Sequence, residues 1–101
     1  MSKNILVISA SLRNGSNSDM LADEFMRGAL ESGNNAEKIT LRGKSINFCK
    51  GCLACQKTGK CVIKDDIAEI LSKMQQADVI CFASPVYFYD MCGQLKTFLD
   101  R

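Results

Sequence analysis

Residues 5–18, with the sequence ILVISASLRNGSNS, give the strongest indication of the fold. Its first four residues form an unbroken apolar run, which is typical of a strand buried on both faces of a parallel sheet. The ten residues that follow are mostly small and polar, so they predict a loop. A buried strand that runs into such a loop, with a helix behind it, is the opening of an α/β unit.

The helix behind this loop is predicted to begin at about Asp19, where the period of the apolar residues changes. Ser16 lies three residues before Asp19, which is the spacing of a capping box, and Gly33 is a natural C-terminal stop. The apolar face of the helix is expected to contain Leu21, Phe25 and Ala29.

The rest of the chain repeats this alternation of strand and helix. Further strands are predicted over residues 36–41 and 79–83, and a third helix from about residue 95. The second helix opens at Asp65-Asp66, and its apolar residues at helical spacing are Ile67, Ile70, Leu71 and Met74. We interpret the two aspartates as a helix cap, because a helix N-terminus favours negative charge without any catalytic role. The order predicts a parallel sheet with right-handed crossovers.

Composition narrows the class of protein. The 101 residues fit one domain over 1–101, and a hydrophobic content of 47% is enough to bury a core. The net charge is +2 with scattered basic residues, so we expect no nucleic-acid partner. The apolar runs are far shorter than the about 20 residues of a membrane span, so we expect a cytoplasmic protein without a membrane partner. The absence of histidine excludes catalysis by a histidine base.

A ligand site is expected where two loops follow the first and third strands, because open parallel sheets bind ligands outside the carboxyl ends of their strands. The first loop, residues 9–18, can offer backbone N–H groups, hydroxyls and the Arg13 guanidinium to an anion at a helix N-terminus. The alternative is an ordinary loop before a capped helix. The first loop has neither a Walker motif nor a Gly-x-Gly-x-x-Gly fingerprint.

Two separated motifs resemble the NAD(P)H-dependent FMN reductases. Residues 9–18 resemble the FMN-phosphate loop of that family, residues 83–88 (ASPVYF) resemble its flavin-ring loop, and residues 93–101 resemble the helix that follows. The resemblance implies a flavodoxin-like three-layer αβα fold. It also implies that the FMN phosphate is held by Ser9, Ser11, Arg13, Ser16, Asn17 and Ser18. The isoalloxazine ring would be lined by Pro85, Val86, Tyr87 and Phe88.

By the same resemblance the protein transfers a hydride from NAD(P)H through FMN to a small-molecule acceptor such as a flavin or a quinone. The cofactor carries that chemistry, and no side chain is required as a general acid or base. The alternative for the aromatic residues 87–89 is a loop that packs on the core or on a partner chain.

Four cysteines are gathered in residues 48–62, which we interpret as a cysteine-rich loop insertion. Their spacing, Cys-x2-Cys-x2-Cys-x5-Cys, resembles the motif of the iron–sulfur flavoproteins, and it implies a [4Fe–4S] cluster held by Cys49, Cys52, Cys55 and Cys61. Zinc ligation and reduced or redox-active thiols without a metal are the alternatives. A cluster would favour an electron carrier over a reductase. Cys81 is expected in the core, and Cys92 is expected to be incidental.

The sequence departs from the family in the number of strands. A flavodoxin-like sheet has five strands in the order 2-1-3-4-5, whereas this sequence predicts three. We therefore expect a fold truncated after the third strand and third helix, with an exposed third strand that a homodimer would cover. Weakened FMN binding would follow, and a third alternative is a truncated, non-catalytic dimeric remnant.

Overall fold

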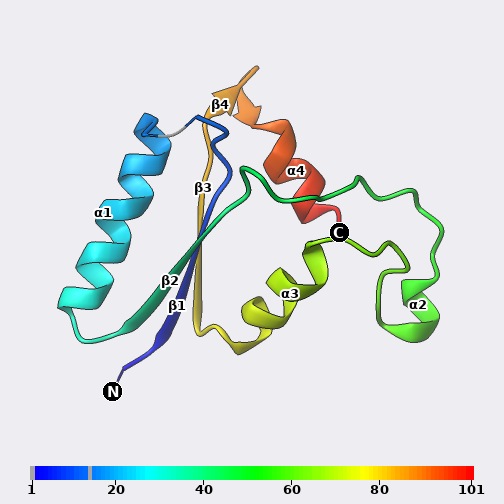
Figure 1. Ribbon diagram of the computed structural model, residues 1–101, viewed down its shortest axis with the longest axis horizontal. Helices are drawn as coiled ribbons and strands as arrows, with labels where there is room; N and C mark the ends of the chain where they lie inside the picture. The colour runs from blue at the N-terminus through cyan, green and yellow to red at the C-terminus, as the bar shows by residue number, and fades with distance from the viewer. Residues whose placement is uncertain (1, 14) are drawn as a thin grey trace.

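A parallel three-stranded sheet forms the centre of the protein, whose computed structural model describes residues 2–13 and 15–101 (Figure 1). The strands lie in the order β2-β1-β3, and all pairs are parallel. Ile8 of β1 stands beside Ile39 of β2 and Phe82 of β3. The predicted parallel α/β sheet is confirmed, and its order is that of the first three strands of a flavodoxin-like fold. The strands are β1 (Asn4–Ser9), β2 (Asn35–Thr40) and β3 (Val79–Ala83).

Helices cover both faces of this sheet and make three layers (Figure 1). On one side lies α1 (Asn17–Glu31), and on the other lie α3 (Ile67–Gln76) and α4 (Gly93–Leu99). Successive side chains of β1 point to opposite faces, so Val7 and Ile8 are both fully buried in different layers. The main core lies on the side of α3 and α4 and contains Leu6, Ile8, Ala10, Ile39, Leu41, Ile67, Ile70, Cys92, Leu95 and Phe98.

The face that α1 presents to the sheet differs from the prediction. Ala22 is buried, whereas Leu21 is 71% and Phe25 is 43% exposed. The apolar residues of this helix span a wider arc than the sheet can cover. The helix therefore approaches the sheet most closely at the small Ala22, and the larger Leu21 and Phe25 lie to the side of this contact.

Two short elements were missed because they are too short to show a period. One is the single turn α2 (Cys55–Thr58), which lies apart from the sheet within residues 42–66 (Figure 1). The other is an antiparallel hairpin of β4 (Val86–Tyr87) and β5 (Asp90–Met91), within a stretch predicted to be a loop.

The outer edge of β3 forms no strand pair within the residues that the structure describes. Val79 and Phe82 on this strand are 39% and 42% exposed. The expected homodimer would cover them, and it stays a prediction. Among the described residues, no helix has the length and apolar character needed to cross a bilayer.

Candidate functional site

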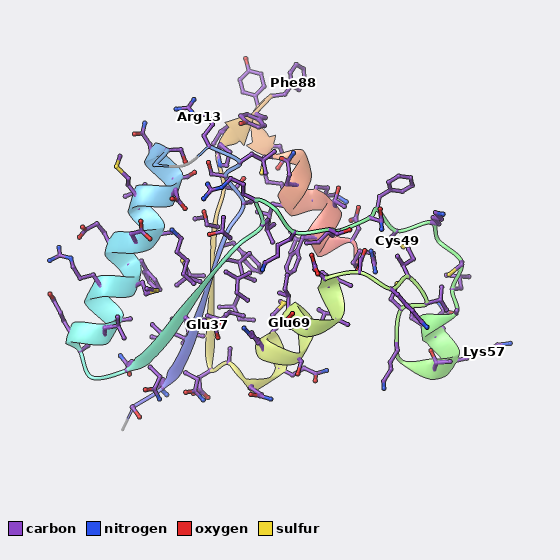
Figure 2. All side chains as sticks on the ribbon, viewed as in Figure 1. Arg13, Glu37, Cys49, Lys57, Glu69 and Phe88 are labelled. Atoms are coloured by element: carbon purple, nitrogen blue, oxygen red, sulfur yellow. The ribbon has the colours of Figure 1, made fainter. Side chains whose placement is uncertain are left out.

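The loops after β1 and β3 meet at one end of the sheet around a cavity of about 350 Å³. Arg13 and Phe88, from the two loops, both lie at this end of the molecule (Figure 2). The cavity is open, and it lies at the carboxyl ends of the strands, where ligands bind in this architecture. Its lining consists of Ser11, Arg13, Ser16, Asn17, Ser18, Leu21, Ser84, Pro85, Val86 and Tyr87.

One wall of the cavity is the N-terminus of α1. Ser16 is the N-cap residue, and its Oγ accepts a hydrogen bond from the Asp19 amide at 3.3 Å. The same hydroxyl donates to Ser11 Oγ at 2.6 Å and lies 3.4 Å from Ser18 Oγ. Ser11 in turn fixes the loop, since its Oγ accepts from the Arg13 amide at 3.2 Å. The hydroxyls of Ser11, Ser16 and Ser18 and the positive end of the helix dipole therefore lie at the cavity, an arrangement that suits an anion.

A buried carboxylate beneath this wall holds the loop in place. Asp19 Oδ1 accepts from Ser9 Oγ at 2.8 Å and from Lys38 Nζ at 2.8 Å. The hydrogen bond from Lys38 lowers the pKa of Asp19, against burial, which would raise it. Burial works to lower the pKa of Lys38, but the hydrogen bonds to Asp19 and to Asp23 (2.6 Å) raise it overall. The negative charge of Asp19 is thus neutralised locally, and the anion-binding wall keeps its positive field.

Ser9 was predicted to bind the FMN phosphate, but in this structure its hydroxyl donates to Asp19. Ser9 is fully buried, and its hydroxyl is occupied by Asp19, so it lies outside the cavity lining. The expected capping box is half formed, because Asp19 bonds Ser9 and Lys38 through its side chain instead of returning to the N-cap. A role for Lys38 was not predicted from the sequence. Its only local mark is that it is a charged residue on the face of β2 that α1 covers, where its neighbour on β1 is Val7.

The other wall is the loop from Ser84 to Cys92. Ser84 Oγ accepts from the Cys92 amide at 3.0 Å, and Cys92 Sγ donates to the Ala10 carbonyl at 3.6 Å. Cys92 is fully buried. The interpretation of Cys92 as incidental is wrong in this structure, because the buried Cys92 contacts both the second loop and the residue that follows β1.

Comparison with known proteins matches residues 3–101 to the family described as NADPH-dependent FMN reductase. The chain belongs to the NADPH-dependent FMN reductase family. An iron–sulfur flavoprotein of Methanocaldococcus jannaschii is 43% identical over 97 residues, which are 96% of this chain and 50% of that protein. An iron–sulfur flavoprotein of Archaeoglobus fulgidus is 36% identical over 94 residues, which are 93% of this chain and 43% of that protein.

A solved structure shares the fold of this FMN reductase family chain. The NAD(P)H:quinone oxidoreductase from Methanothermobacter marburgensis superposes with a TM-score of 0.84 at 22% identity, over 100% of this chain and 53% of that one. The flavodoxin-like fold is thereby confirmed. The chain spans about half the length of the curated relatives it matches.

In this FMN reductase family chain the hairpin tip points away from the cavity. Phe88 and Tyr89 are 94% and 95% exposed, with an edge-to-face contact of 5.8 Å between their ring centroids. Their φ angles are 49° and 65°, a left-handed conformation that residues with a Cβ rarely adopt. Phe88 was predicted to line the flavin ring but lies outside the cavity lining, because the two-residue turn carries it beyond the wall that Tyr87 forms.

The four clustered cysteines are all exposed. Gly51 and Gly59 have positive φ angles of 71° and 75°, as the tight wrapping of this segment requires. Within residues 2–13 and 15–101, no three Cys, Asp or Glu side chains are placed to hold one metal ion. Cys49, Cys52, Cys55 and Cys61 have the donor chemistry of a cluster site, but this structure does not bring their thiols together. The [4Fe–4S] cluster therefore stays a prediction.

Proposed function

We propose that the chain contributes the FMN-binding part of an oxidoreductase that passes a hydride from NAD(P)H through FMN to a flavin, quinone or similar acceptor. The observation that carries this proposal is the convergence of the loops after β1 and β3 on one cavity. An anion-binding wall and a largely uncharged wall face each other there. A flavin mononucleotide needs both, one for its phosphate and one for its ring.

The residues present fit FMN at each end. Arg13 supplies a positive charge beside the hydroxyls of Ser11 and Ser16, which suits a phosphate. Pro85 and Tyr87 supply an apolar edge and an aromatic face, which suit an isoalloxazine ring. The cavity volume of about 350 Å³ lies at the lower end of ligand sites, about 300–1,000 Å³.

Bound FMN would supply hydride acceptance and donation, and the protein would bind and orient it. Among the described residues that line the cavity, none carries a carboxylate or an imidazole. The lining thus suits cofactor chemistry better than general acid–base chemistry. Because the cavity is open, NAD(P)H and the acceptor would reach the flavin in turn, and the kinetics would be of the ping-pong type.

Titration of FMN and riboflavin tests this proposal, with binding followed by quenching of flavin fluorescence. Arg13→Ala removes one charge-assisted contact to phosphate, which is worth about 1.5–3 kcal/mol, so FMN affinity should fall about 10- to 150-fold. Riboflavin lacks the phosphate, and its affinity should be the same for both proteins. Arg42→Ala removes an exposed arginine outside the cavity lining and serves as the matched control.

Equal loss of FMN and riboflavin affinity in the Arg13 variant would contradict the assignment of this loop to phosphate. A folded chain that binds no FMN at micromolar concentration would favour the non-catalytic remnant instead. Where FMN binds, oxidation of NADH and NADPH with a quinone or free flavin as acceptor tests the reaction itself.

The second candidate function is an iron–sulfur flavoprotein that carries single electrons. The Cys49–Cys61 spacing favours it, and both relatives described above are named iron–sulfur flavoproteins. In that case Cys49, Cys52, Cys55 and Cys61 would hold the cluster, which supplies one-electron transfer. Anaerobic reconstitution with iron and sulfide should give a brown protein with iron bound, and Cys52→Ser should lose that iron. Binding of zinc alone, or of no metal, would remove this candidate.

A further inference from the structure

Among the described residues, the most deeply buried charge pair lies away from the cavity, between Arg101 and Asp65. Their side chains are 0% and 1% exposed. The guanidinium binds the carboxylate through both of its terminal nitrogens, with Nη1–Oδ2 at 2.8 Å and Nη2–Oδ1 at 3.1 Å. This two-pronged geometry is available to arginine but not to lysine.

The same guanidinium binds both ends of the cysteine-rich segment, residues 48–62. Nη1 donates to the Asn47 carbonyl at 2.6 Å, just before the segment, and Nη2 donates to the Ile63 carbonyl at 3.3 Å, just after it. Asp65 Oδ2 also accepts from the Asn47 amide at 2.9 Å. All four terminal N–H groups of Arg101 therefore have partners, and together they close the base of the segment.

Asp65 combines this role with the one predicted from the sequence. Its Oδ1 accepts from the Ile67 amide at 3.2 Å, so it does satisfy an N–H group in the first turn of α3. Asp66 is the formal N-cap residue, but its carboxylate instead accepts from the Ser45 amide at 2.5 Å. Asp65 and Asp66 thus join residues 45–47, which lead into the cysteine-rich segment, to the start of α3, and a simple helix cap would not do this.

The helix α4 connects this base to the cavity. Its N-cap, Cys92, is bonded to Ser84 and Ala10 at the two cavity walls. Arg101 lies two residues beyond the last residue of the helix, Leu99, and its amide bonds the Phe98 carbonyl. A helix of seven residues is about 10 Å long and resists bending, so it sets the spacing between the two sites.

The fifth N–H group of the Arg101 guanidinium, at Nε, differs from the other four. Nε is buried and has no acceptor within the part of the chain that the structure describes. The hydrogen bond to Asp65 is the main cause that raises the pKa of Arg101, and Cys61 raises it further.

We propose that Arg101 is a positioning residue: paired with Asp65, it clamps the two ends of the cysteine-rich segment and, through α4, holds that segment at a fixed place relative to the cavity. The clamp stands on contacts within the chain, so it does not depend on what the cysteines or the cavity bind. It goes beyond the proposed function, and failure of FMN binding would leave it intact.

Hydrogen exchange of the full chain, followed by mass spectrometry of peptides from residues 44–66, tests the clamp. Arg101→Lys keeps the charge but cannot make four bonds, so exchange in this region should accelerate about tenfold or more. Lys96→Gln removes an exposed ion pair between α4 and its C-cap residue, Asp100, and it should leave the exchange unchanged. Exchange within about twofold of the original protein in Arg101→Lys would overturn the proposal.

A second variant separates the clamp from general stability. Arg101→Met combined with Asp65→Leu replaces the buried pair by apolar side chains, a change that is often neutral or stabilising. Alkylation of the buried Cys92 reports whether the sheet and α4 stay folded. We expect Cys92 to stay protected while residues 44–66 exchange rapidly. Recovery of slow exchange in this double variant would show that packing holds the segment, and it would overturn the proposal.

Discussion

Replacing Asp65 with asparagine should remove a large part of the acid sensitivity of this protein. The hydrogen bonds from Arg101, above all, lower the pKa of Asp65 from 3.8 to about 2 in the folded chain. A fall of that size corresponds to about 2.4 kcal/mol of stability at neutral pH. Because the folded pKa is depressed, this stability is present above about pH 4 and is lost as the pH falls from about 4 to about 2.

The Asp65→Asn variant has two expected effects. At pH 7 the Arg101 charge stays buried without its counter-ion, so the free energy of unfolding should fall by about 3–5 kcal/mol. Between pH 5 and pH 2 the gap between the two proteins should shrink by about 2 kcal/mol, since protonation of Asp65, which is half complete in the folded chain at pH 2, removes the same charge from the original protein. Urea unfolding followed by far-ultraviolet circular dichroism at several pH values measures both.

Asp100→Asn is the control, because the ion pair of Asp100 with Lys96 is largely exposed and should contribute less than about 1 kcal/mol. Asp19 also has a lowered pKa, but it contributes equally to both proteins and cancels in their difference. A gap of the same size at pH 5 and at pH 2 would refute the reasoning, as would an Asp65→Asn variant that is as stable as the control at pH 7.

Three further predictions follow from the structure. Phe88→Gly should raise the unfolding temperature by several degrees, because glycine removes about 1 kcal/mol of strain at a φ of 49°; a lower temperature in a thermal scan would mean that the exposed ring makes stabilising contacts. Lys38→Met should destabilise the chain by about 3 kcal/mol in urea, since it leaves the Asp19 carboxylate buried without a cation; a change below about 1 kcal/mol would show that Ser9 alone suffices. The chain should be a homodimer in light scattering, and Val79→Lys should shift it towards monomer, because a lysine on an edge strand opposes strand pairing. A monodisperse monomer of the original chain would contradict this prediction.

The candidate site was predictable where its signal was local. The loop of residues 9–18 lies between an unbroken apolar strand and a periodic helix, and each of these features is visible within a few residues of sequence. The rule that ligands bind at the carboxyl ends of parallel strands then brings two loops to the same end. Eight of the ten residues expected to bind the cofactor line the cavity: Ser11, Arg13, Ser16, Asn17, Ser18, Pro85, Val86 and Tyr87.

The remaining two residues could not be placed from the sequence. Ser9 faces Asp19 inside the domain, and Phe88 stands at a hairpin tip. The alternation of side chains along a strand could have placed Ser9 on one face of the sheet. Nothing in the sequence indicates that the Asp19 carboxylate lies on that face. The hairpin contains only two-residue strands, and its turn lacks the Asn-Gly or Gly residues by which such turns are normally found.

The alternation of strands and helices, the parallel sheet and the loop suited to an anion could all be predicted from the amino-acid sequence. Each of these depends on the spacing of side chains a few positions apart. Which polar groups are neutralised, and which segments are joined, depends on contacts between distant parts of the folded chain. Lys38 meets Asp19 from a different element, and Arg101 meets Asp65 from 36 residues away. A buried charge is stable only where a partner faces it, and the identity of that partner depends on how the chain returns in space, which no local pattern encodes.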